Sequence, residues 1–157
     1  MSRTQVLDRQ VGAAMSALSP AAKRGLGDPV LAELVTVRAS QLDHCAFCLD
    51  MHLRLAREQG VGEQRLGLLD AWEEAGDLCS ERERAAPALT EAVTVLAGGA
   101  SQAFGSGGGF VPDEVYEKAA EHFGEAELAH PTGLIAAVNG WNRIMVSRRV
   151  APGGYQP

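Results

Sequence analysis

The stretch Glu33-Leu-Val-Thr-Val-Arg-Ala-Ser-Gln-Leu-Asp-His-Cys45-Ala-Phe-Cys48-Leu-Asp-Met-His52 joins an apolar segment to two thiols and an imidazole. If residues 44–59 form a helix, Cys45, Cys48 and His52 are three and then four positions apart and lie on one face. The charged side chains of this segment lie on the opposite face and meet water. The pattern therefore predicts an amphipathic helix that directs a redox-capable set toward a protein interior or an interface.

The position of the first thiol within this helix has a chemical consequence. Cys45 lies near the expected helix start, just after Asp43, which we predict to be the N-cap. Unpaired N–H groups and the positive end of the helix dipole favour thiolate over thiol at such a position. This reasoning from the residues favours Cys45 as the thiol with the lower pKa.

The overall composition excludes some classes of function. The chain has 157 residues and a net charge of -6 without a basic stripe, which argues against nucleic acid or an anionic membrane surface as partner. No apolar run approaches the roughly 20 residues of a membrane span, and the first residues lack a signal-peptide pattern. We predict one domain, residues 1–157, in the cytoplasm. Thiols are normally reduced there, so the Cys-x-x-Cys pair is expected to be catalytic or metal-binding rather than a structural disulfide.

The apolar periodicity is helical along nearly the whole chain, which predicts an all-α fold. Ser19-Pro20 is expected to close the first helix, Gly60 and Gly76 to end later ones, and Pro131 to bend or restart the last. The expected helices span residues 5–18, 29–41, 44–59, 62–75, 80–96, 112–123 and 125–149. The segment 29–41 is apolar on most sides and should be central. Residues 97–111 are glycine-rich and are predicted to form a loop.

Glu33 is a further residue with chemical potential. It shares a helical stripe with Thr36 and Ser40, a polar seam in an apolar helix that leads toward the cysteines. A buried carboxylate there would have a raised pKa and serve as a proton acceptor near neutral pH. The alternative is a solvated helix edge, which the residues by themselves favour.

The stretch from Glu33 to His52 closely resembles the core motif of the alkylhydroperoxidase D-like (AhpD-like) proteins, part of the carboxymuconolactone decarboxylase superfamily. That motif has a glutamate twelve residues before the first cysteine, then Cys-x-x-Cys, then a histidine four residues after the second cysteine. All four positions match. The similarity continues through Leu69-Asp-Ala-Trp72-Glu-Glu-Ala, Ser80-Glu-Arg-Glu-Arg-Ala, Val111-Pro-Asp-Glu-Val-Tyr116 and Val138-Asn-Gly-Trp141-Asn142-Arg143.

The resemblance implies a helical bundle that assembles as a homo-trimer or homo-hexamer, and an alkyl hydroperoxide reductase-like, antioxidant peroxidase activity. It implies that Cys48 is the peroxidatic thiol, Cys45 the resolving thiol, His52 the base, and Glu33 a member of the proton relay. It implies no bound cofactor or metal, a hydroperoxide substrate, and a dithiol or lipoyl-type partner that reduces the disulfide. Because the helix-start argument points to Cys45 instead, which cysteine attacks the peroxide stays open.

One position departs from the family pattern. The best-defined alkylhydroperoxidases have a second histidine just before the second cysteine, where this chain has Phe47. His44, three residues earlier, is a candidate substitute. Cys79 stands apart from the motif and is expected to be a small buried hydrophobe.

Three alternatives remain beside the peroxidase. A zinc site could use Cys45, Cys48 and His52 with His44 or Cys79. However, Cys45 and His52 are seven residues apart, a rise of about 10 Å along a helix. Such a separation makes it difficult for both side chains to form bonds of about 2.0–2.3 Å to one zinc ion. A lactone decarboxylase-like enzyme is another known activity of the superfamily, although those members generally lack the cysteine pair. The third alternative is a non-catalytic oligomeric helical protein with a redox-active disulfide.

Overall fold

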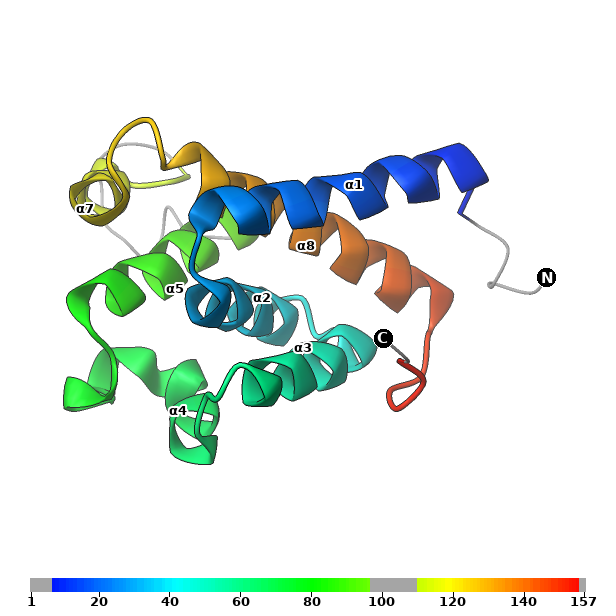
Figure 1. Cartoon of the computed structure of the whole chain (residues 1–157), viewed down its shortest axis with the longest axis horizontal. Helices are drawn as coiled ribbons and strands as arrows, with labels where there is room; N and C mark the ends of the chain where they lie inside the picture. The colour runs from blue at the N-terminus through cyan, green and yellow to red at the C-terminus, as the bar shows by residue number, and fades with distance from the viewer. Residues whose placement is uncertain (1–6, 97–109, 156–157) are drawn as a thin grey trace.

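The computed structural model of the chain describes residues 7–96 and 110–155 (Figure 1). Over these residues every regular element is a helix, which confirms the predicted all-α class. The α-helices are α1 (Arg9–Leu26), α2 (Pro29–Leu42), α3 (Ala46–Glu58), α4 (Glu63–Leu68), α5 (Glu81–Thr94), α7 (Asp113–Phe123) and α8 (Ala129–Arg148), and two short 3-10 helices are η2 (Leu69–Glu74) and η3 (Gly76–Leu78). Most of the predicted glycine-rich loop, residues 97–109, lies outside the described residues.

Helix α2 is the central element, as its nearly uniform apolar surface predicted. The Asp28 carboxylate caps it by accepting a hydrogen bond from the Leu31 N–H at 2.9 Å, and Pro29 occupies its first turn, where a missing N–H costs nothing. Every residue from 31 to 40 is buried. Helices α1, α3, α5 and α8 all pack against it, so α2 lies in the middle of the bundle (Figure 1).

The apolar residues form two clusters on either side of α2. The larger cluster joins α2 to α1, α5, α7 and α8 and contains Ala22, Leu26, Leu31, Ala32, Val35, Ala86, Leu89, Ala92, Val115, Ala119, Phe123, Leu128, Leu134 and Ile135. The smaller cluster joins α2 to α3, α4 and η2 and contains Leu34, Val37, Ala56, Val61, Leu66 and Leu69. Both sides of α2 are therefore fixed, which holds Glu33 and the α2–α3 turn in place.

Helix α1 is longer than the sequence predicted. It continues through Pro20 to Leu26, so the prediction that Ser19-Pro20 closes it is wrong. Pro20 has no N–H to donate to the carbonyl of Ser16, four residues earlier in the helix. Ser16 is exposed, so water can donate to this carbonyl instead. The added turns bring Gly25 against the His130 ring of α8, where only a residue without a side chain fits. A Cβ on Gly25 would lie 2.0 Å from the His130 Nδ1.

Two other boundaries also differ from the prediction. The predicted helix 62–75 breaks into α4 and η2, with Ala71 in a non-helical conformation (φ -120°, ψ 37°), and η3 follows it. Helix α8 begins at Ala129 rather than at residue 125, so Pro131 lies in its first turn and interrupts no hydrogen bond. Helix α5 begins at a capping box, in which Ser80 and Glu83 each bond the other's backbone N–H.

The described part of the chain holds no helix with both the length and the hydropathy that crossing a bilayer requires.

Replacing Ile135 with Ala should reduce the free energy of unfolding by about 2–5 kcal/mol, because a fully buried side chain leaves a cavity between α8 and α2. Val146→Ala, on the same helix but 46% exposed, is the matched control and should change it by less than about 0.5 kcal/mol. Urea denaturation measures both values. Equal effects of the two substitutions would contradict this assignment of the core.

Candidate active site

The turn between α2 and α3 sets the position of the first cysteine. Helix α2 runs to Leu42, and His44 then takes a left-handed conformation (φ 53°) that reverses the chain. The N-cap of α3 is Cys45, whose Sγ accepts a hydrogen bond from the Cys48 N–H at 3.3 Å. The prediction that Asp43 caps α3 is wrong, because Asp43 still belongs to the last turn of α2, where its N–H bonds the Ala39 carbonyl at 3.0 Å.

The two cysteines of the motif are joined as a disulfide, Cys45–Cys48, with 5.3 Å between their Cα atoms. Both residues are only 2% exposed. The Cα separation lies in the range of ordinary disulfides, so this backbone accommodates the oxidised pair. The helical turn thus brings together the two sulfurs that the sequence predicted to act as a pair.

Glu33 and His52 meet in the interior, although they come from different helices. The His52 Nδ1 lies 2.9 Å from Glu33 Oε2, and both side chains are buried. Thr36 donates to the same carboxylate oxygen at 3.2 Å. Lys23, from α1, forms a salt bridge with the other oxygen, Oε1. One carboxylate therefore connects α1, α2 and α3.

The charge state of Glu33 follows from these partners. Burial of the carboxyl by itself raises its pKa, but the hydrogen bond and the charge of His52, together with Lys23, outweigh burial and lower the pKa below 4.5. The expectation of a raised pKa is therefore wrong, because the residue pattern did not reveal the contacts of Glu33 with His52 and Lys23. The alternative of a solvated edge is wrong as well, since Glu33 is 5% exposed.

An ionised Glu33 also determines the tautomer of His52. A carboxylate oxygen only accepts hydrogen bonds, so the proton of a neutral imidazole must be on Nδ1, which faces Glu33. Nε2 then carries the free lone pair. The pair has the arrangement in which a carboxylate orients a histidine that takes up a proton through its other nitrogen.

A pocket of about 380 Å³ lies against this site. Its walls come mainly from α1, α3 and α8 and are largely apolar. They consist of Ser16, Ser19, Pro20, Lys23, Thr36, Phe47, Cys48, Met51, His52, Leu55, Leu134, Val138, Trp141, Asn142, Met145 and Tyr155. Cys48 and His52 line the pocket one helical turn apart, whereas Cys45 is absent from its walls.

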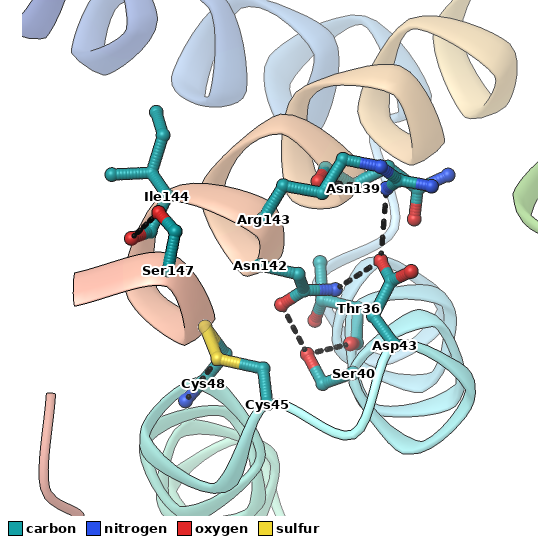
Figure 2. Close-up of a disulfide and its surroundings, with 10 residues drawn as sticks. All are labelled: Thr36, Ser40, Asp43, Cys45, Cys48, Asn139, Asn142, Arg143, Ile144 and Ser147. Carbon is teal, nitrogen blue, oxygen red and sulfur yellow. Dashed lines mark hydrogen bonds and ion pairs between the residues drawn. A yellow bond between two sulfur atoms is a disulfide. The ribbon is translucent and has the colours of Figure 1, made fainter. Parts of the chain in front are cut away.

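A second polar network supports the α2–α3 turn from α8 (Figure 2). The fully buried Asn142 donates to Asp43 Oδ2 at 3.0 Å and accepts from the Ser40 hydroxyl at 3.1 Å. Ser40 also lies 2.7 Å from the Thr36 carbonyl, and Arg143 donates to Asp43 at 3.2 Å. Figure 2 shows these side chains gathered beside the disulfide. The network fixes the turn that carries Cys45.

Sequence reasoning missed the role of Lys23, and no motif marks it. Its contact with Glu33 depends on α1 continuing past Pro20, which carries Lys23 to the side chain of Glu33 on α2. His44, the proposed substitute for the missing histidine, is exposed and does not line the pocket, whereas Phe47 does. Cys79 is a free thiol and only half-buried, so the prediction of full burial is wrong.

No group of three or more His, Cys, Asp or Glu side chains within residues 7–96 and 110–155 is arranged to hold a metal ion. Cys45 and Cys48 bond each other here, so neither sulfur is a thiolate ligand in this state.

Comparison with known proteins identifies the family of the chain. The profile of the carboxymuconolactone decarboxylase family matches residues 9–92. An uncharacterized Bacillus subtilis protein, YdfG, is 38% identical over 115 residues, which cover 73% of this chain and 71% of YdfG. An uncharacterized Escherichia coli protein, YnjA, is 30% identical over 118 residues, 74% of this chain and 58% of YnjA.

A solved structure is similar over nearly its whole length. ATU0492 from Agrobacterium tumefaciens, a protein of unknown function suggested to be an antioxidant defence protein AhpD, superposes with a TM-score of 0.81 at 30% identity and covers 94% of each chain. The chain belongs to the carboxymuconolactone decarboxylase family. Within it, the fold and the Cys-x-x-Cys motif are of the AhpD-like type.

The acid dependence of stability tests the state of Glu33. The folded pKa is lowered from 4.5, so the ionised carboxylate stabilises the protein above that pH, and this contribution is lost as the pH falls through the lower folded pKa. Wild type should therefore exceed Glu33→Gln in stability, with a difference that shrinks as pH falls. Urea denaturation of both proteins from about pH 6 to about pH 3 measures it. A difference that stays constant with pH would contradict an ionised, paired Glu33.

Proposed function

We propose that this protein is a thiol-dependent peroxidase that reduces organic hydroperoxides through Cys48 and Cys45. The observation that carries the proposal is the shared pocket wall: the Cys48 sulfur and an imidazole oriented by Glu33 line the same apolar cavity. A buried thiol beside an oriented base in a cavity that admits a small molecule is the arrangement of an activated nucleophile.

The first step is proton transfer. In the reduced protein, His52 Nε2 accepts the Cys48 thiol proton, directly or through one water, and Glu33 stabilises the resulting imidazolium at Nδ1. Lys23 and Thr36 hold the Glu33 carboxylate in the required orientation. The product is a thiolate at Cys48, the form of cysteine that attacks peroxides.

The second step is oxygen transfer. The Cys48 thiolate attacks the terminal oxygen of the hydroperoxide, the O–O bond breaks, and Cys48 becomes a sulfenic acid. The alkoxide that leaves takes the proton from the His52 imidazolium and departs as an alcohol. The Cys45 thiol then attacks the sulfenic sulfur, water is released, and the Cys45–Cys48 disulfide forms. The structure holds this oxidised pair.

A third step must restore the thiols. An external dithiol, of the lipoyl type or another, attacks the disulfide and is itself oxidised to a disulfide, which returns Cys45 and Cys48 to thiols. This reducing partner is part of the proposal, as is the absence of a bound cofactor. The cytoplasmic location and the assembly into trimers or hexamers stay predictions from the sequence.

The assignment of roles to the two sulfurs rests on their surroundings. Cys48 lines the pocket with His52, whereas Cys45 caps the helix and faces the turn held by Asn142. The helix-start argument alone favours Cys45, because its sulfur accepts the Cys48 N–H. Contact with the substrate cavity outweighs that hydrogen bond, since the attacking atom must reach the peroxide.

The pocket indicates an organic hydroperoxide as the substrate. Leu55, Leu134, Val138, Trp141 and Met145 supply an apolar surface that hydrogen peroxide does not need. Its volume is in the range of small-ligand sites. A lactone decarboxylase in the same cavity has no use for two sulfurs close enough to bond.

Cysteine replacement tests the proposal. Stopped-flow mixing of the reduced protein with cumene hydroperoxide should show rapid thiol oxidation in wild type. Cys48→Ser, which lacks the attacking thiol, should show no rapid oxidation of the motif. Cys45→Ser should accumulate a sulfenate that dimedone traps, because the resolving thiol is missing. Cys79→Ser, which removes the thiol outside the motif, is the control and should behave as wild type.

Two results would contradict the scheme. Oxidation of Cys48→Ser at the wild-type rate, with a trapped sulfenate at Cys45, would reverse the roles. Turnover that is unaffected by loss of both motif cysteines would overturn the peroxidase proposal and favour another activity of the family.

Replacing His52 with Gln should lower the rate of hydroperoxide reduction by about 10²–10⁴-fold, the usual contribution of a positioned acid or base. The loss should diminish as the pH is raised, since solvent then deprotonates the thiol without help. The pH–rate profiles of wild type and His52→Gln measure this. Parallel profiles would mean that His52 does not take up the thiol proton.

A further inference from the structure

Residues 150–155 fold back over helix α3 after α8 ends. Figure 1 shows this segment, in red, turning away from the end of α8 and forming a loop near one end of α3. Pro152 and Gly153 form a turn in which Gly153 has a positive φ of 83°. Such a turn suits proline followed by glycine, because glycine adopts positive φ without steric cost. The Gly153 N–H donates to Asp50 Oδ2 on α3 at 2.8 Å.

A second attachment lies one helical turn further along α3. Arg54 Nη1 donates to the Tyr155 carbonyl at 3.3 Å, and the guanidinium carbon lies 5.9 Å from the centre of the Tyr155 ring. This distance is that of a weak cation–π contact. Asp50 and Arg54 are both surface residues, and together they hold the segment at two points along one edge of the helix.

The attached segment reaches the candidate active site through a single side chain. Tyr155 is half-buried and lines the same pocket as Cys48 and His52. Met51 and Leu55, the neighbours of Asp50 and Arg54 on α3, also line this pocket. The segment therefore crosses from the outer surface of α3 to the pocket wall. Because Cys48 is 2% exposed, a molecule reaches its sulfur by way of this pocket.

We propose that residues 150–155 form a strap, and that the ring of Tyr155 limits by size which molecules reach the Cys48 sulfur. This proposal rests on the proposed function in one respect: it takes the molecules that enter the pocket to be organic hydroperoxides. Its attachments are few and involve exposed side chains, so they stabilise the closed arrangement modestly and allow it to open. Tyr155 is thus a specificity-determining residue of the pocket.

Alkylation of the reduced full chain tests the strap without reference to peroxide chemistry. In a Cys45→Ser, Cys79→Ser background Cys48 is the sole thiol, and its second-order rate constants with iodoacetamide and with fluorescein maleimide are compared. Tyr155→Ala should raise the rate with the bulky maleimide about fivefold to tenfold, as expected for loss of a contact that favours a closed state. The rate with iodoacetamide should change less than about twofold, because a small reagent already passes. Unchanged maleimide reactivity would overturn the proposal.

Two neighbouring glycines provide a matched control. Gly153→Ala places a side chain on a residue with positive φ and should loosen the turn, which raises the maleimide rate as Tyr155→Ala does. Gly154→Ala has open space around its Cβ and no positive φ, so it should react as the parent protein does. Arg54→Ala, which removes the second attachment, should resemble Gly153→Ala. If Gly153→Ala, Gly154→Ala and Arg54→Ala all reacted with the maleimide at the rate of the parent protein, the proposal of a strap would be contradicted.

Hydroperoxide kinetics separate failure of the strap from failure of the proposed function. In the protein with all its cysteines, Tyr155→Ala should raise the ratio of the cumene hydroperoxide rate to the hydrogen peroxide rate. If maleimide access responds but no hydroperoxide oxidises Cys48, the strap stands and the peroxidase proposal fails. If hydroperoxides oxidise Cys48 but neither the ratio nor maleimide access responds, the strap is overturned and the peroxidase proposal stands.

Discussion

The buried carboxylate of Glu33 is the constraint on which the site depends. Removing a carboxylate from water costs several kcal/mol unless opposite charges and hydrogen bonds compensate it. Lys23 from α1, Thr36 from α2 and His52 from α3 provide that compensation. Three helices must therefore meet at one point, and the imidazole must present its Nδ1 to the carboxylate. The electrostatic requirement of this one residue thus constrains how α1, α2 and α3 meet at Glu33, and it sets the tautomer of His52.

The same packing positions the two sulfurs. Helix α2 ends at the turn that carries Cys45, and α3 begins there with His52 two turns further on. Asn142 holds this turn from α8 through Asp43 and Ser40, so its position does not depend on the local backbone alone. Helices α3 and α8 then enclose the apolar pocket with α1. The Glu33–His52 pair, the Cys45–Cys48 disulfide and the pocket beside them all depend on the contacts of one buried helix.

Local patterns in the sequence predicted most of the fold and the pairing of Cys45 with Cys48, whereas the link between Glu33 and His52 was implied only by the family resemblance. The apolar surface of residues 29–41 identified the central helix, and the spacing of Cys48 and His52 placed both on one face of α3. Cys45, predicted to share that face, is instead the N-cap of α3 and does not line the pocket. Contacts between distant residues were not predictable in the same way. Lys23 joins the site only because α1 continues through Pro20, whose lost hydrogen bond faces water, and no propensity rule anticipates that. The pKa of Glu33 is lowered first by His52 and then by this lysine. Tyr155 reaches the pocket only after the chain reverses at Gly153.

The central claim is that Glu33 fixes the proton of His52 on Nδ1 and leaves Nε2 to accept the proton of Cys48. Nitrogen-15 NMR of the imidazole in the reduced protein measures this tautomer directly, with the His52 resonances assigned by their absence from a His52→Gln spectrum. With an ionised Glu33 bonded to the ring, we expect a protonated Nδ1 and an unprotonated Nε2 in the neutral ring, and loss of this preference in Glu33→Gln. A neutral ring with its proton on Nε2 would overturn the assigned role of Glu33.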